Sequence, residues 1–265
     1  MPLLEPLLAV LCGSFVGFAL GLLGGGGSIL ATPLLLYVIG LAPHQAIGTG
    51  ALAVSASALT NFAAHFRAGN VRWRSATLFA AIGMIGAFAG SQIGKAIDGR
   101  RLLFLFALLM IAVGIKMARS RPGCPVGDVP AGFRYCNRKS IPGIAGSALA
   151  VGTLSGFFGI GGGFLIVPAM LFSTGMPMLF AVGSSLLAVG AFGLTTSANY
   201  AISGLVDWPV AAEYIAGGFI GGWIGMRLAC RLSDHKASLN RIFAGLVCLV
   251  ACYMLYRNAS VLHLV

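Results

Sequence analysis

Two runs of glycine are the part of this sequence best suited to binding a ligand. Each stands just before a short apolar stretch that contains a proline, Pro33 in one case and Pro168 in the other. A glycine run can end one helix and leave unpaired backbone N–H groups at the start of the next. Those groups, together with the positive end of the helix dipole, bind anions without a charged side chain. The expected anion-binding residues are Gly24, Gly25, Gly26, Gly27 and Ser28 in the first run, and Gly159, Gly161, Gly162 and Gly163 in the second.

Small polar residues follow each run. Thr49 in the first half corresponds to Ser184 in the second, and Ser185 comes directly after it. A hydroxyl near a helix start can bind an oxyanion, or it can donate instead to a backbone carbonyl one turn earlier. Asn199, deep in an apolar stretch, presents a similar choice between a ligand contact and a hydrogen bond that joins two helices.

Ionisable residues within the apolar stretches are scarce. The candidates for carrying a coupling proton are Glu213 within an apolar run, and Asp207 and His44 at the margins of such runs. A position at the membrane interface is the competing explanation for each of them. The sequence has no Gly-x-Ser-x-Gly, His-Glu-x-x-His, Walker or Gly-x-Gly-x-x-Gly motif, so we expect neither an enzyme nor a cofactor.

Glycines spaced four residues apart predict a different role. The pairs are Gly17/Gly21, Gly86/Gly90 and Gly221/Gly225. Small residues at this spacing let two membrane helices approach each other closely. We expect these pairs to serve helix packing rather than ligand binding.

An internal repeat relates the two glycine runs. A shift of 135 residues matches 21 of the 57 positions from 17 to 73 without a gap. The matches include Gly48/Gly183, Gly69/Gly204 and Trp73/Trp208. Duplicated membrane units are typical of transporters, whose binding sites lie where the two copies meet.

The composition places the chain in a lipid bilayer. It is 58% hydrophobic and only 9% charged, whereas a soluble domain is roughly 25% charged. The net charge of +11 comes from lysines and arginines in short loops between apolar runs, which the positive-inside rule explains without nucleic acid. The expected fold is an all-α, multi-pass membrane protein.

The apolar runs divide into five segments in each half. Those at 28–41 and 163–175 are too short to span and are expected to be interrupted or re-entrant helices. Five segments per half put 13 of the 17 lysines and arginines on one side, whereas four per half give a split of 10 against 7. The positive-inside rule therefore favours inverted copies with a cytoplasmic linker and periplasmic termini, and four plus four is the alternative.

The linker separates two membrane repeats. We expect the first repeat at 1–118, the linker at 119–141 and the second repeat at 142–265. Cys124 and Cys136 flank a Pro/Gly-rich part of the linker, and we expect neither a disulfide in the reducing cytoplasm nor a metal site.

These motifs resemble the TauE/SafE sulfite exporter family of anion permeases. The resemblance rests on the glycine run before Pro33, on Ala46-Ile-Gly-Thr49, on Gly69 to Trp73, and on the recurrence of this pattern in the second half. It implies transport of sulfite or small organosulfur anions across the bacterial inner membrane. Because the sequence has no ATP-binding motif, we expect the transport to be secondary or passive. The alternatives are uptake of another small anion, or a structural or assembly role. The motifs do not indicate an oligomeric state.

Overall fold

The computed structural model describes residues 4–67, 69–119, 141–176, 178–231 and 236–258. Within these residues the only regular structure is helical, which confirms the expected all-α class. The linker cysteines Cys124 and Cys136 lie outside the described residues. In the first half the elements are α1 (Leu4–Leu23), η1 (Gly24–Leu30), α2 (Ala31–Leu34), η2 (Leu35–Ile39), α3 (Pro43–Arg67), α4 (Trp73–Ala96) and α5 (Gly99–Arg119). In the second half they are α6 (Ile141–Phe158), α7 (Gly163–Thr174), α8 (Met178–Ile202), α9 (Trp208–Arg231) and α10 (Lys236–Asn258).

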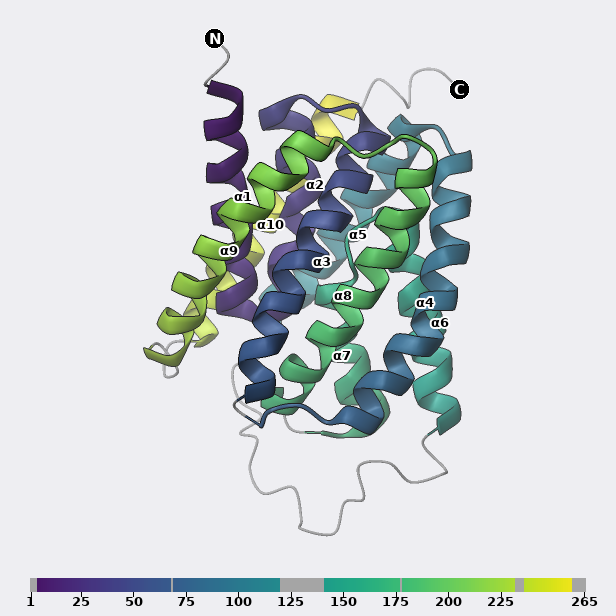
Figure 1. Ribbon diagram of the computed structural model, residues 1–265, viewed down its shortest axis with the longest axis vertical. Coiled ribbons are helices and arrows are strands. Elements are labelled where there is room, and N and C mark those ends of the chain that lie inside the picture. The colour runs from purple at the N-terminus through teal and green to yellow at the C-terminus, as the bar shows by residue number, and fades with distance from the viewer. Residues whose placement is uncertain (1–3, 68, 120–140, 177, 232–235, 259–265) are drawn as a thin grey trace.

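Three of the described helices are long and apolar enough to cross a membrane: Pro43–Arg67, Trp73–Ala96 and the Phe180–Ile202 part of α8. Shorter apolar helices accompany them, among them Glu5–Gly21 and Pro142–Phe158. The connection between α3 and α4 lies at one end of the molecule, and that between α8 and α9 lies at the other (Figure 1). The long helices α3 and α8 pack against each other in the interior.

Glycines bring the backbones of two helix pairs into direct contact. On α1, a Cβ added to Gly17 would overlap the carbonyl oxygen of Gly218 on α9. On α6, a Cβ added to Gly152 would overlap the carbonyl oxygen of Gly83 on α4. The spaced glycines Gly86, Gly90, Gly221 and Gly225 make contacts of the same kind. The prediction of close helix packing is confirmed for Gly17 and these four glycines, and it stays a prediction for Gly21.

We expect Gly156→Ala to destabilise the protein. The added methyl on α6 would overlap the carbonyl oxygen of Ala87 on α4, and overpacking costs about 1–3 kcal/mol. Gly146, on the same helix, has nothing within 4 Å of an added Cβ, so Gly146→Ala should leave the midpoint of thermal unfolding unchanged or raise it. Unfolding in detergent, followed by circular dichroism, measures both variants; equal midpoints would contradict the packing account.

Candidate functional site

The second glycine run breaks the chain between α6 and α7. Gly159, Gly161 and Gly162 have φ values of 66°, 69° and 68°, the left-handed region that favours glycine. The first amides of α7 that bond within this turn are those of Leu165 and Ile166, both donating to the Gly162 carbonyl. Earlier in the run, the Ile160 N–H donates to the Ser155 carbonyl at 3.3 Å. The first N–H groups of α7, before Leu165, stand at a helix start, where no intrahelical carbonyl is available.

This break lies in the centre of the molecule. A Cβ on Gly161 would lie 3.1 Å from Val54 Cγ1 of α3 and 3.4 Å from Val189 Cγ1 of α8. Both valines are halfway along helices of 25 residues. The backbone of the second run is thus held at mid-height between the two long interior helices.

The first glycine run has a different conformation but reaches the same region. Gly24–Leu30 forms a 3-10 helix, followed by the four residues of α2 and a π-helical turn. This segment packs against both α1 and α7, so the two breaks are neighbours. Ser28 within it is fully buried.

Two buried hydroxyl groups next to the breaks have no hydrogen-bond partner. One is Thr32 Oγ1 on α2, and the other is Ser155 Oγ, which lies against Gly162. Both residues are at most 1% exposed. A buried hydroxyl without a partner costs about 1–3 kcal/mol, and such a group is what an enclosed oxyanion would satisfy. Neither residue was among the predicted site residues. The repeat partner of Thr32 is Val167 and that of Ser155 is Leu20, so the repeat carries no signal for either hydroxyl.

Thr49 and Ser184 hold loops of the opposite half. The Thr49 hydroxyl accepts a hydrogen bond from the backbone N–H of Asp207 at 3.0 Å, and the Ser184 hydroxyl accepts one from Arg72 N–H at 2.9 Å. These loops lie at opposite ends of the molecule (Figure 1), so the two hydroxyls do not meet at one site. Ser185 donates to the carbonyl of Val182 at 2.8 Å, which is the back-bonding alternative.

Asn199 belongs to an interhelical network rather than to the glycine breaks. The Lys95 ammonium donates to Asn199 Oδ1 at 2.8 Å, to the Asn199 carbonyl at 3.1 Å and to Ser203 Oγ at 2.9 Å. The Asn199 amide donates in turn to Ser91 Oγ. We call these four residues the Lys95 clasp. It ties α4 to the end of α8 and contains no carboxylate to neutralise the lysine.

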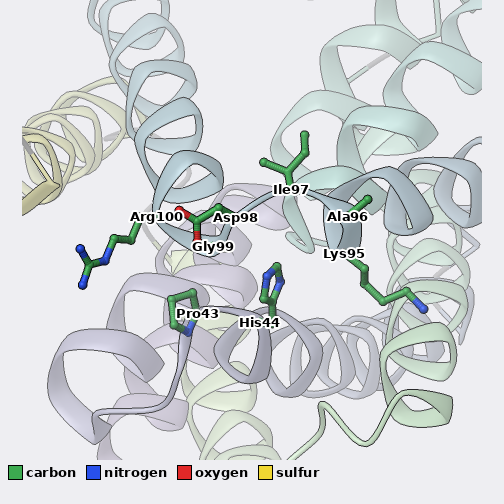
Figure 2. Close-up of a pocket in the computed structure, with 8 residues that line it drawn as sticks. All are labelled: Pro43, His44, Lys95, Ala96, Ile97, Asp98, Gly99 and Arg100. Atoms are coloured by element: carbon green, nitrogen blue, oxygen red, sulfur yellow. The ribbon is translucent and has the colours of Figure 1, made fainter. Parts of the chain in front are cut away.

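The three coupling candidates occupy separate places. Asp207 Oδ1 accepts from the Val210 N–H at 3.2 Å and so caps the start of α9. Glu213 is half-buried on α9, and the described residues give it no hydrogen-bond or ion-pair partner. His44 lines a pocket of about 440 Å³ at the start of α3 (Figure 2).

The basic residues around that pocket do not converge in it. Figure 2 shows the Lys95 side chain extending away from the centre of the pocket, and the Arg100 side chain extending away on the opposite side. Asp98 also lines the pocket. His44 Nδ1 is buried without a partner, but an anion here would meet a carboxylate and no inward-pointing cation. We therefore do not place the anion site in this pocket.

A family model describes nearly the whole chain. The model for "Sulfite exporter TauE/SafE" matches residues 9–254. The chain belongs to the TauE/SafE sulfite exporter family. A probable membrane transporter protein of Xylella fastidiosa (strain 9a5c) is 56% identical over 93% of each chain. The probable membrane transporter protein YunE of Bacillus subtilis is 26% identical over 94% of this chain and 97% of its own. No solved structure matches.

This membership agrees with the helical architecture. The relatives are named as probable membrane transporters, and the TauE/SafE chain described here has the apolar helices that such a protein needs.

Proposed function

We propose that the protein carries small sulfur oxyanions, sulfite or an organosulfonate, out of the cell across the inner membrane. The observation that supports this most is the break at Gly159–Gly163, held at the middle of the interior helices beside the unpartnered Ser155 hydroxyl. Helix-start N–H groups and hydroxyls stabilise an oxyanion without fixing it by a salt bridge. An anion held in this way can also leave.

The proposed architecture is a pair of inverted repeats, residues 1–118 and 142–265, joined by the linker. Repeat partners make equivalent contacts: Thr49 with the loop before α9, and Ser184 with the loop before α4. The repeat partners Gly69 and Gly204 share φ values of 72° and 69°. Their loops lie at opposite ends in Figure 1, as an axis within the membrane plane requires.

The charge distribution supports one orientation of this arrangement in the membrane. The three basic segments around the α3–α4 loop, the linker and the α9–α10 connection hold 13 of the 17 lysines and arginines. The positive-inside rule places them in the cytoplasm and both termini in the periplasm. The Lys95 clasp then lies toward the periplasmic side. There it closes the interface between α4 and α8, which we call the α4–α8 seam.

Flux of labelled sulfite from liposomes containing the purified protein tests the proposal. An imposed membrane potential should drive sulfite flux without a pH gradient, and unlabelled sulfonates should compete for it. Each elementary charge leaving a negative interior gains about 2.3 kcal/mol per 100 mV, which makes a coupling ion unnecessary. Absence of flux for every small anion in the panel would refute a transport role.

We expect Glu213→Gln to retain most of this flux. The side chain lies half-buried on α9, and no described residue contacts it as a hydrogen-bond partner. A neutral amide of the same shape therefore changes little if export needs no coupling proton. Flux under a potential alone is the measurement, and its complete loss would replace uniport with proton coupling.

A further inference from the structure

A cavity of about 470 Å³ lies between α3 and α9, away from the central break. Its α3 wall includes Ser57, Asn61 and Arg67, and its α9 wall includes Gly218 and Trp223. The helix pair α3–α9 is the repeat counterpart of the pair α8–α4, which the Lys95 clasp closes. The two seams are therefore equivalent in sequence position but differ in how tightly they are filled.

The sequence explains why only one of the two seams is open. On α8, the ring of Phe192 lies directly against Gly83 of α4 and stacks on Phe79 with ring centroids 6.2 Å apart. The repeat partner of Phe192 is Ser57, which lies against Gly218. A serine leaves the space that a phenylalanine fills. The partners of Asn199 and Lys95 are Ala64 and Cys230, which cannot form a clasp of the same kind.

Asn61 supplies an unsatisfied donor to this cavity. Its side chain is 8% exposed, and its Nδ2 is buried without a hydrogen-bond partner. The amide faces Gly222 of α9, where an added Cβ would lie 3.4 Å from Asn61 Oδ1 and 3.5 Å from Asn61 Nδ2. The neighbouring Thr60 hydroxyl already donates to the Ala56 carbonyl at 2.6 Å. A buried N–H donor without an acceptor is costly, so the cavity is suited to a ligand that brings an acceptor.

The charge of the cavity selects the kind of ligand. Among the described residues that line it, Arg67 is the only charged one, and none is a carboxylate. The Arg227 guanidinium lies over the Trp223 ring at 3.6 Å from its centroid, which brings a second cation beside the α9 wall. Guanidinium groups bind planar or tetrahedral oxyanions through paired N–H donors.

We propose that this cavity is a second anion-binding site, a vestibule in which Asn61 Nδ2 and the Arg67 guanidinium hold a small sulfur oxyanion before it reaches the central break. The proposal deepens the proposed function and rests on it for the identity of the anion. Under this proposal, the open gap between α3 and α9 lies on the basic side of the molecule. The anion then enters from the side that the charge distribution assigns to the cytoplasm.

Trp223 allows binding to be measured separately from transport. The chain has three tryptophans, so Trp73→Phe with Trp208→Phe leaves Trp223 as the only tryptophan, whose emission is excited selectively over that of the tyrosines. Sulfite added to this full-length protein in detergent should shift the Trp223 emission in a saturable way. Asn61→Leu and Arg67→Gln should each weaken the apparent affinity about tenfold or more, because each removes a hydrogen bond to a charged ligand. Arg257→Gln, a matched loss of charge on α10, should leave it unchanged.

The outcomes separate this proposal from the transport function. Unchanged Trp223 emission at every sulfite concentration that leaves the protein folded would overturn the vestibule, and liposome flux would still stand by itself. A saturable shift without flux would retain the anion site and refute transport. Arg67 is exposed, so Arg67→Gln is expected to fold and to give a measured affinity even if Asn61→Leu fails to fold. An unchanged affinity for sulfite in Arg67→Gln would also overturn the proposal.

Discussion

Gly161→Val is expected to abolish anion flux while the protein still inserts and folds. The position has a φ of 69°, which a β-branched residue adopts only with strain of about 1–3 kcal/mol. The new side chain would also press on Val54 and Val189, because even a Cβ lies 3.1 Å and 3.4 Å from their methyl groups. Both effects displace the break at the point where we place the anion. We expect a flux loss of about a hundredfold or more, since a misplacement of about 1 Å at a binding site has that effect.

A matched glycine distinguishes this local effect from general backbone strain. Gly175 has a φ of 65°, but an added Cβ there would meet nothing within 4 Å. Gly175→Val therefore carries the same strain outside the centre of the molecule and should transport sulfite at a rate close to that of the unmodified chain. Equal sulfite flux in folded Gly161→Val and Gly175→Val would mean that the anion does not bind at the central break.

Lys95→Met is expected to open the α4–α8 seam. The ammonium makes three hydrogen bonds to α8 and the residue that follows it, and each hydrogen bond to a charged group contributes about 1.5–3 kcal/mol. Loss of about 3 kcal/mol changes the ratio of closed to open states roughly a hundredfold. Thr196 is fully buried, one helical turn before Asn199, so its position reports on this opening.

The measurement is thiol labelling of Thr196→Cys in a chain whose six native cysteines are replaced. The labelling rate should rise at least about tenfold when Lys95→Met is added. Lys95→Arg, which keeps the charge and the donors, should restore most of the protection. Arg101→Met removes an exposed charge near the same end and should change nothing. An unchanged rate in Lys95→Met would mean that the clasp does not hold the seam closed.

The sequence predicted the helical segments well because lipid restricts the backbone so strongly. Apolar runs at 163–175 and 208–229 became α7 at Gly163–Thr174 and α9 at Trp208–Arg231, since a helix satisfies its own backbone in an apolar solvent. The spaced glycines were equally informative, because only a missing side chain permits backbone contact between helices.

The roles of individual polar residues could not be predicted in the same way. Thr49 and Asn199 have the chemistry of anion ligands, but which partner a hydroxyl or amide meets depends on a helix or loop far away in the chain. Thr49 meets the Asp207 N–H, 158 residues away in the sequence, and Asn199 meets Lys95, 104 residues away. Asn61 carried one usable signal in the sequence, since its repeat partner, Thr196, is also a polar residue within an apolar run.

The crossed bonds of Thr49 and Ser184 also bear on how such a protein could arise. Each half supplies the acceptor for a loop of the other half, so neither half is complete by itself. Under the inverted arrangement, an unfused ancestor would have been a homodimer of one polypeptide inserted in both orientations. Such a polypeptide must insert either way with similar ease, which requires its lysines and arginines to be balanced between the two sides. Under the same proposed arrangement, the split of 13 against 4 would have arisen after gene fusion, once each half needed to insert in only one orientation.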